Sequence, residues 1–223
     1  MTIRTEAIDI YARAYNKLCS MTGYDLKTYP LGNNNIGTGF ESDGIKFVFA
    51  KASEDQYTWN PFANHELNSI CIPLQPIILE SKSLMQMNAI DLFANYMNEL
   101  LADAILHEIV HLLDKDISEY NCDFDDKQCY YNNSHEKLAY SAELYTVIEQ
   151  SLDKKALPYF IKLLGSKESI IKYIKRELKN NINVKTFIEF IEYLTEENYK
   201  WFKAYCLEEY NISKADRFDF IRF

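Results

Sequence analysis

The chain has 223 residues, of which 48% are hydrophobic, 14% aromatic and 26% charged. This composition is typical of a globular protein and argues against a largely disordered chain. The length suits one compact domain, or a domain with a helical extension. A net charge of -9 gives no reason to bind phosphate backbones or anionic lipid, so we expect neither a nucleic-acid nor a membrane partner.

The N-terminal residues contain no continuous apolar core and no small-residue cleavage site. No later segment approaches about eighteen uncharged apolar residues, so we expect neither a signal peptide nor a membrane span. Five cysteines, an odd number without a C-x-x-C pair, favour reduced thiols in a cytoplasm. A protein delivered into another cell would look the same. The sequence indicates no oligomeric state.

The first half of the chain predicts a helix and then a small, mostly antiparallel sheet. Residues 5–21 have helical spacing of apolar side chains, and asparagines and glycines between residues 32 and 39 are expected to break the chain. Asp43-Gly44 lies between two apolar segments and predicts a hairpin with residues 45–50 as its second strand. Residues 69–74 predict a further strand.

The second half is predicted to be helical. Residues 88–114 lack Gly and Pro and have apolar residues every three or four positions, which predicts one long helix or two, with Asn88 as the N-cap. The polar segment 116–133 is expected to be an exposed connection. A second strong helix is predicted for residues 134–153, and several amphipathic helices should follow up to residue 223.

The pentapeptide His107-Glu108-Ile109-Val110-His111 carries the chemistry. In a helix, residues i and i+4 share a face, so the two imidazoles can bind a single Zn²⁺. Glu108 then lies beside the metal, where its carboxylate can act as the general base towards a water. The apolar neighbours predict a buried helix, in which polar groups need partners. The alternative is a pair of structural histidines.

A catalytic zinc site needs a third protein ligand, and the next helix offers two glutamates. Glu136 and Glu143 are seven residues apart and share a helix face. Glu143 is the single formal charge between residues 138 and 148, so burial slightly favours it as the ligand. Glu136 could instead form a capping pair with Asn133.

The HEIVH motif followed by a glutamate on a second helix resembles the gluzincin branch of the zincin metallopeptidases. Residues 136–145, EKLAYSAELY, look like the E-A-N-x-F-A-A-E-L-L segment of the ImmA/IrrE-type peptidases. They are also similar to the E-F-F-A-E-x-F helix of the anthrax lethal factor and Pro-Pro endopeptidase group. Both resemblances imply Glu136 as the third ligand. Glu143 would then orient a ligand histidine, or would be the ligand itself.

Other polar residues have less specific patterns. The lethal-factor resemblance implies an oxyanion-stabilising tyrosine before the ligand glutamate. We assign it to Tyr131, with Tyr130 and Tyr140 as alternatives. Asp114 could orient an imidazole or end a solvated helix. The acidic loop with Asp123, Asp125 and Asp126 could bind Ca²⁺, but it lacks regular ligand spacing and is expected to be solvated. The pair His65-Glu66 is expected at the surface.

The sequence therefore predicts an α+β, zincin-like fold with a small N-terminal sheet, an active-site helix and a helical C-terminal region. The metallopeptidase core is predicted at residues 1–152, with residues 153–223 packed on it. The expected activity is a zinc metalloendopeptidase that cleaves a protein or peptide, with the substrate pairing along the strand at residues 69–74. One alternative is a non-catalytic zincin-like regulatory module that binds metal or protein. Another is a helical interaction protein that works through residues 154–223.

Overall fold

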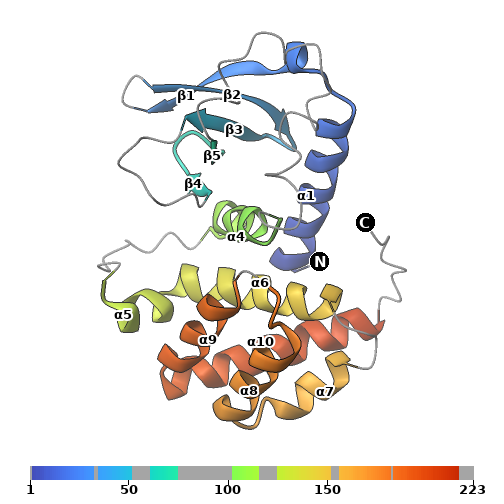
Figure 1. Cartoon of the computed structure of the whole chain (residues 1–223), viewed down its shortest axis with the longest axis vertical. Coiled ribbons are helices and arrows are strands. Elements are labelled where there is room, and N and C mark those ends of the chain that lie inside the picture. The colour runs from blue at the N-terminus through green and yellow to red at the C-terminus, as the bar shows by residue number, and fades with distance from the viewer. Residues whose placement is uncertain are drawn as a thin grey trace. The chain divides into compact units, whose positions relative to one another are not determined.

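The computed structural model of the chain (Figure 1) describes residues 2–32, 35–51, 61–74, 102–115, 125–151, 156–181 and 183–215. The chain divides into two compact units, Met1–Lys115 and Asp116–Phe223. This division reflects packing within each unit and does not test which residues form a peptidase core. The core expected at residues 1–152 therefore stays a prediction. The described helices include none that is long and apolar enough to cross a membrane.

The first unit begins with helix α1, Ile3–Cys19, which confirms the predicted N-terminal helix with a start two residues earlier. Thr2 caps it: the Thr5 N–H donates to the Thr2 hydroxyl at 3.2 Å, while the Thr2 N–H donates to the Thr5 hydroxyl at 2.9 Å. This reciprocal arrangement satisfies two backbone donors at the helix start. The buried face of α1 contacts helix α4, Ala102–Leu113, and the sheet.

After a 3₁₀ turn at Gly23–Asp25, the described strands form one five-stranded mixed sheet. The strands are β1 Lys27–Gly32, β2 Asn35–Ser42, β3 Ile45–Lys51, β4 Phe62–Asn64 and β5 Ser69–Leu74. Their order is β1-β2-β3-β5-β4, and every neighbouring pair is antiparallel except β3 and β5. The predicted α+β class with a small, mostly antiparallel sheet is confirmed.

The predicted hairpin is confirmed, whereas the predicted chain break before it is wrong over residues 35–39, which lie in β2. Residues 33 and 34, also part of that prediction, lie outside the described residues. Asp43 and Gly44 connect β2 to β3, and both have positive φ values of 54° and 77°, as the tight turns of two-residue hairpins require. Gly39, expected in a break, lies inside β2. A Cβ at Gly39 would come within 2.0 Å of the Phe47 carbonyl oxygen, so this glycine serves close strand packing.

Strand β5 has a neighbour on each side, and this corrects the expected substrate edge. It pairs with β3 in parallel and with β4 in antiparallel orientation. Among the described strands β4 therefore forms the edge of the sheet next to β5, rather than β5 itself. Helix α4 contacts β4 and β5 within the same unit, as Figure 1 shows.

The second unit consists of helices (Figure 1), which confirms the helical C-terminal region. They are α5 Lys127–Asn132, α6 Ser134–Ser151, α7 Ala156–Leu163, α8 Lys167–Glu177, α9 Val184–Tyr193 and α10 Glu196–Ala215. The expected exposed connection at residues 116–133 is therefore wrong over α5. This short helix forms because Asp126 accepts the Cys129 N–H at 3.0 Å and because Tyr131 is buried in the core of the unit.

One described cysteine, Cys129, differs from the expectation of reduced thiols. Cys19, Cys71 and Cys206 are free, whereas Cys129 is disulfide-bonded, and Cys122 lies outside the described residues. The prediction failed because cysteine spacing does not show which thiols meet in the folded chain.

Candidate metal centre

Helix α4 carries the HEIVH motif and places both of its histidines together. The ring centroids of His107 and His111 lie 4.7 Å apart with an interplanar angle of 72°, as the i, i+4 spacing predicts. His107 is 6% exposed and His111 is half-buried. The apolar residues of the motif, Ile109 and Val110, are fully buried and anchor the helix. The expected N-cap at Asn88 lies outside the described residues.

Glu108 is half-buried and is held by the sheet of the same unit. Its Oε2 accepts the backbone N–H of Ala63 in β4, at 2.7 Å. This distance is that of a charge-assisted hydrogen bond. The sequence gives no side-chain signal for this contact, because the donor is a backbone group. No strand was predicted at the position of β4, Phe62–Asn64.

Glu136 lies in the first turn of α6 in the second unit and is 6% exposed. The capping pair considered for it would use the Asn133 N–H as donor. That N–H instead donates to the carbonyl oxygens of Cys129 and Tyr130, at 3.0 and 3.2 Å. The Asn133 side chain caps α6 by accepting the His135 N–H at 2.9 Å. Capping therefore does not account for the buried Glu136 carboxylate.

Glu143, two turns later in α6, has a different environment. It is 4% exposed, and its Oε1 accepts a hydrogen bond from Nδ2 of Asn183 at 2.9 Å. Asn183 belongs to the same unit, at the start of α9. Burial, the property that favoured Glu143 as a ligand, thus has an explanation without a metal.

His107, His111 and Glu136 form a group that could hold a metal ion, with one candidate ligand atom from each lying within 4.8 Å of the others. Two imidazoles and one carboxylate are a ligand set of catalytic zinc sites. The donor set of the three side chains therefore fits zinc.

The tyrosines considered for oxyanion stabilisation pack among aromatic rings of the second unit. Tyr131 is 5% exposed, and its ring centroid lies 5.1 Å from that of Tyr130 and 5.2 Å from that of Tyr140. Burial raises the pKa of Tyr131 far above its usual value, and the negative Glu189, a hydrogen-bond partner, raises it further. The Tyr130 and Tyr140 hydroxyl oxygens lie 3.3 Å apart. The oxyanion role of Tyr131 stays a prediction.

The remaining polar candidates have simpler surroundings. The Asp114 N–H donates to the Val110 carbonyl oxygen at 3.0 Å, which continues α4 by one residue. His65 and Glu66 are exposed, as expected. Asp126 caps α5, and Asp123 lies outside the described residues.

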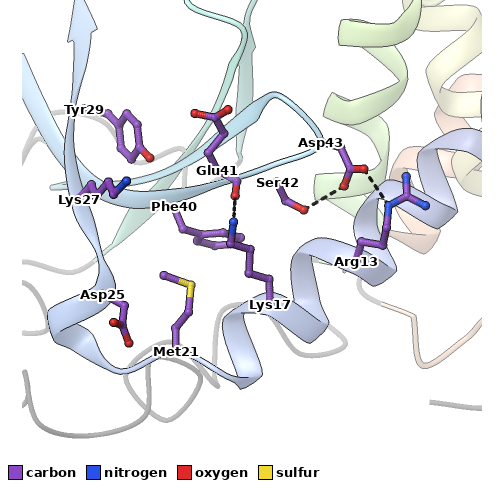
Figure 2. Close-up of a pocket in the computed structure, with 10 residues that line it drawn as sticks. All are labelled: Arg13, Lys17, Met21, Asp25, Lys27, Tyr29, Phe40, Glu41, Ser42 and Asp43. Atoms are coloured by element: carbon purple, nitrogen blue, oxygen red, sulfur yellow. Dashed lines mark hydrogen bonds and ion pairs between the residues drawn. The ribbon is translucent and has the colours of Figure 1, made fainter.

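A separate hollow of about 640 Å³ lies between α1 and strands β1 and β2 (Figure 2). Its size is within the range of ligand sites, but Arg13 and Lys17, two of the cations that line it, are held by neighbouring groups. The Arg13 Nε donates to Asp43 at 2.8 Å, and Lys17 Nζ donates to the Glu41 carbonyl oxygen at 2.5 Å. The hollow contains none of the predicted site residues.

Comparison of the chain with protein-family models, with curated proteins and with solved structures finds no match.

Proposed function

We propose that the protein is a zinc metallopeptidase in which His107, His111 and Glu136 bind the metal and Glu108 is the general base. The observation that carries the proposal is the grouping of these three ligand side chains around a helix that also presents Glu108. Two neutral imidazoles and one carboxylate leave a zinc ion with a net positive charge and an open position for water. A structural zinc site would instead have four protein ligands.

When bound, zinc supplies Lewis acidity, which activates a water and polarises the scissile carbonyl group. The protein supplies the proton transfers. The Glu108 carboxylate accepts a proton from the attacking water and then delivers it to the leaving amine. A histidine pair that served only to hold a metal would not need a carboxylate at this position.

The substrate is proposed to be a protein or peptide in extended conformation. Strand β4, at the edge of the described sheet, contacts the helix that carries Glu108. An extended peptide can add to such an edge through backbone hydrogen bonds. Binding at this edge would bring the scissile bond towards the proposed metal centre.

The test compares Glu108→Ala with wild-type protein on a library of peptides derived from a cell lysate, with cleavage read by mass spectrometry. We expect zinc content to be unchanged and cleavage to fall by about 10²- to 10⁴-fold, the usual contribution of a general base. Glu66→Ala is the matched control, because Glu66 also follows a histidine but is exposed. This control should cleave as wild type does. A Glu108→Ala variant with full zinc and full cleavage would refute the proposal.

One observation favours the second candidate, a non-catalytic zincin-like module. The hydrogen bond from Ala63 gives Glu108 a structural contact, and a metal-binding module could retain the glutamate for that contact alone. The same experiment separates the two functions: a module binds zinc but shows no peptide cleavage in the wild-type protein.

A further inference from the structure

The hydrogen bond between Ala63 and Glu108 joins residues 45 positions apart, both within the first unit. Strand β4 pairs with β5 in the register Phe62↔Cys71, Ala63↔Ile70 and Asn64↔Ser69. In an antiparallel strand, the N–H and C=O of one residue point to the same side, and the side alternates along the strand. Because the Ala63 N–H reaches Glu108, the N–H and C=O of Ala63 point away from β5. Those of Phe62 and Asn64, its two neighbours in β4, point towards β5.

A backbone donor at this place has a geometric advantage over a side chain. Strand β4 is fixed by its pairing with β5, and the N–H direction is fixed by the strand. A glutamate side chain has several rotatable bonds and loses rotamer freedom when it is ordered. A short hydrogen bond from a rigid strand to Oε2 therefore selects one orientation of the Glu108 carboxylate.

We propose that the backbone N–H of Ala63 is a positioning group that holds the Glu108 carboxylate in its catalytic orientation. This inference rests on the proposed function of Glu108 as general base. It makes β4 part of the catalytic machinery through its backbone. A substrate that adds to the edge of β4 would pair with the Ala63 carbonyl oxygen and leave the Ala63 N–H to Glu108. The side chain at position 63 is not required for this role.

The first experiment removes the N–H and retains the side chain. Replacing Ala63 by lactic acid converts its peptide bond to an ester in the full-length, zinc-loaded protein. We expect kcat to fall by about 10- to 100-fold, as for other groups that orient catalytic residues. Zinc content and KM should change by less than about threefold, because neither depends on the Glu108 orientation.

Two substitutions complete this experiment. Ala63→Pro also removes the N–H, and it retains the ladder with β5 because Ala63 faces away from that strand; it should lower kcat as the ester does. Thr28→Pro is the matched control on strand β1, at the other edge of the sheet. Residue 28 is two positions from Pro30 in that strand, so its N–H lies on the side of β1 where Pro30 already lacks one.

The second experiment has no catalytic readout. In metal-free protein, amide hydrogen exchange at Ala63 should become about tenfold faster or more in Glu108→Ala, because a hydrogen bond to a charged acceptor is lost. Exchange at Ile70 in β5 should be unchanged. Equal exchange at Ala63 in both proteins, or an ester variant with wild-type kcat, would overturn the inference.

The two experiments distinguish failure of the inference from failure of the proposed function. A wild-type protein that cleaves no peptide overturns the proposed function and, with it, the catalytic role of Ala63. An active wild-type protein whose ester variant loses no activity overturns the positioning role alone. In the ester background, Glu108→Ala should cause a smaller further loss than in the wild type, because both changes remove the same oriented base.

Discussion

Glu136→Ala and Glu143→Ala each remove a buried carboxylate from the same helix, but the first should change zinc affinity and the second should change stability. Glu136 belongs to the group that could hold a metal, whereas Glu143 accepts a hydrogen bond from Asn183 at 2.9 Å. We predict that Glu136→Ala loses zinc affinity. Glu143→Ala should retain zinc and lose stability, because its carboxylate connects α6 to the start of α9.

The size of each effect follows from the contact that is lost. Removing a residue that orients a metal ligand costs about 10- to 100-fold in affinity, and a direct ligand should cost more. Glu136→Ala should therefore raise the zinc Kd at least about 100-fold, or about 2.8 kcal/mol. Glu143→Ala removes a hydrogen bond to a charged acceptor, so it should lower the free energy of unfolding by about 1.5–3 kcal/mol.

Zinc affinity is measured by competition with a chromophoric chelator, and stability by urea unfolding of the metal-free proteins. Using metal-free protein for stability removes the contribution of zinc binding to the folded state. The assignment of Glu136 would be refuted if Glu136→Ala bound zinc as tightly as wild type. Loss of zinc in Glu143→Ala, with zinc retained in Glu136→Ala, would identify Glu143 as the ligand.

Two further predictions concern the fold. Burial raises the pKa of Tyr173 and of Tyr199 to about 12, above the unfolded value of about 10, so their stabilising contribution should be full below pH 10 and lost as pH rises towards 12. Urea unfolding across that range checks this, and replacing both tyrosines by phenylalanine should weaken the pH dependence; an unchanged dependence would contradict it. Gly39→Ala should lower the free energy of unfolding by about 1–3 kcal/mol, because its Cβ would meet a backbone oxygen at 2.0 Å. Gly165→Ala is the control, since a Cβ there meets nothing within 4 Å, and an equal loss in both variants would refute the packing argument.

Local features of this protein could be predicted from its sequence. The HEIVH motif places His107 and His111 on one helix face because the helical repeat alone sets their spacing. The Asp43-Gly44 turn was predictable because positive φ values suit a small set of residues. Helix α6 followed from an uninterrupted apolar pattern. Each of these features depends on interactions within a few residues.

Other features were decided by tertiary structure, because they depend on groups far apart in the chain. The Ala63 N–H that meets Glu108 leaves no trace in residue type, since every residue except proline has such a donor. The sequence also predicted β5 at the sheet edge, whereas the three-residue strand β4 pairs with β5 and forms that edge among the described strands. The partner of Glu143, Asn183, lies 40 positions away. The sequence by itself determined the pair of histidines and the adjacent glutamate on one helix, but which backbone group contacts that glutamate depends on long-range packing that local periodicity does not encode.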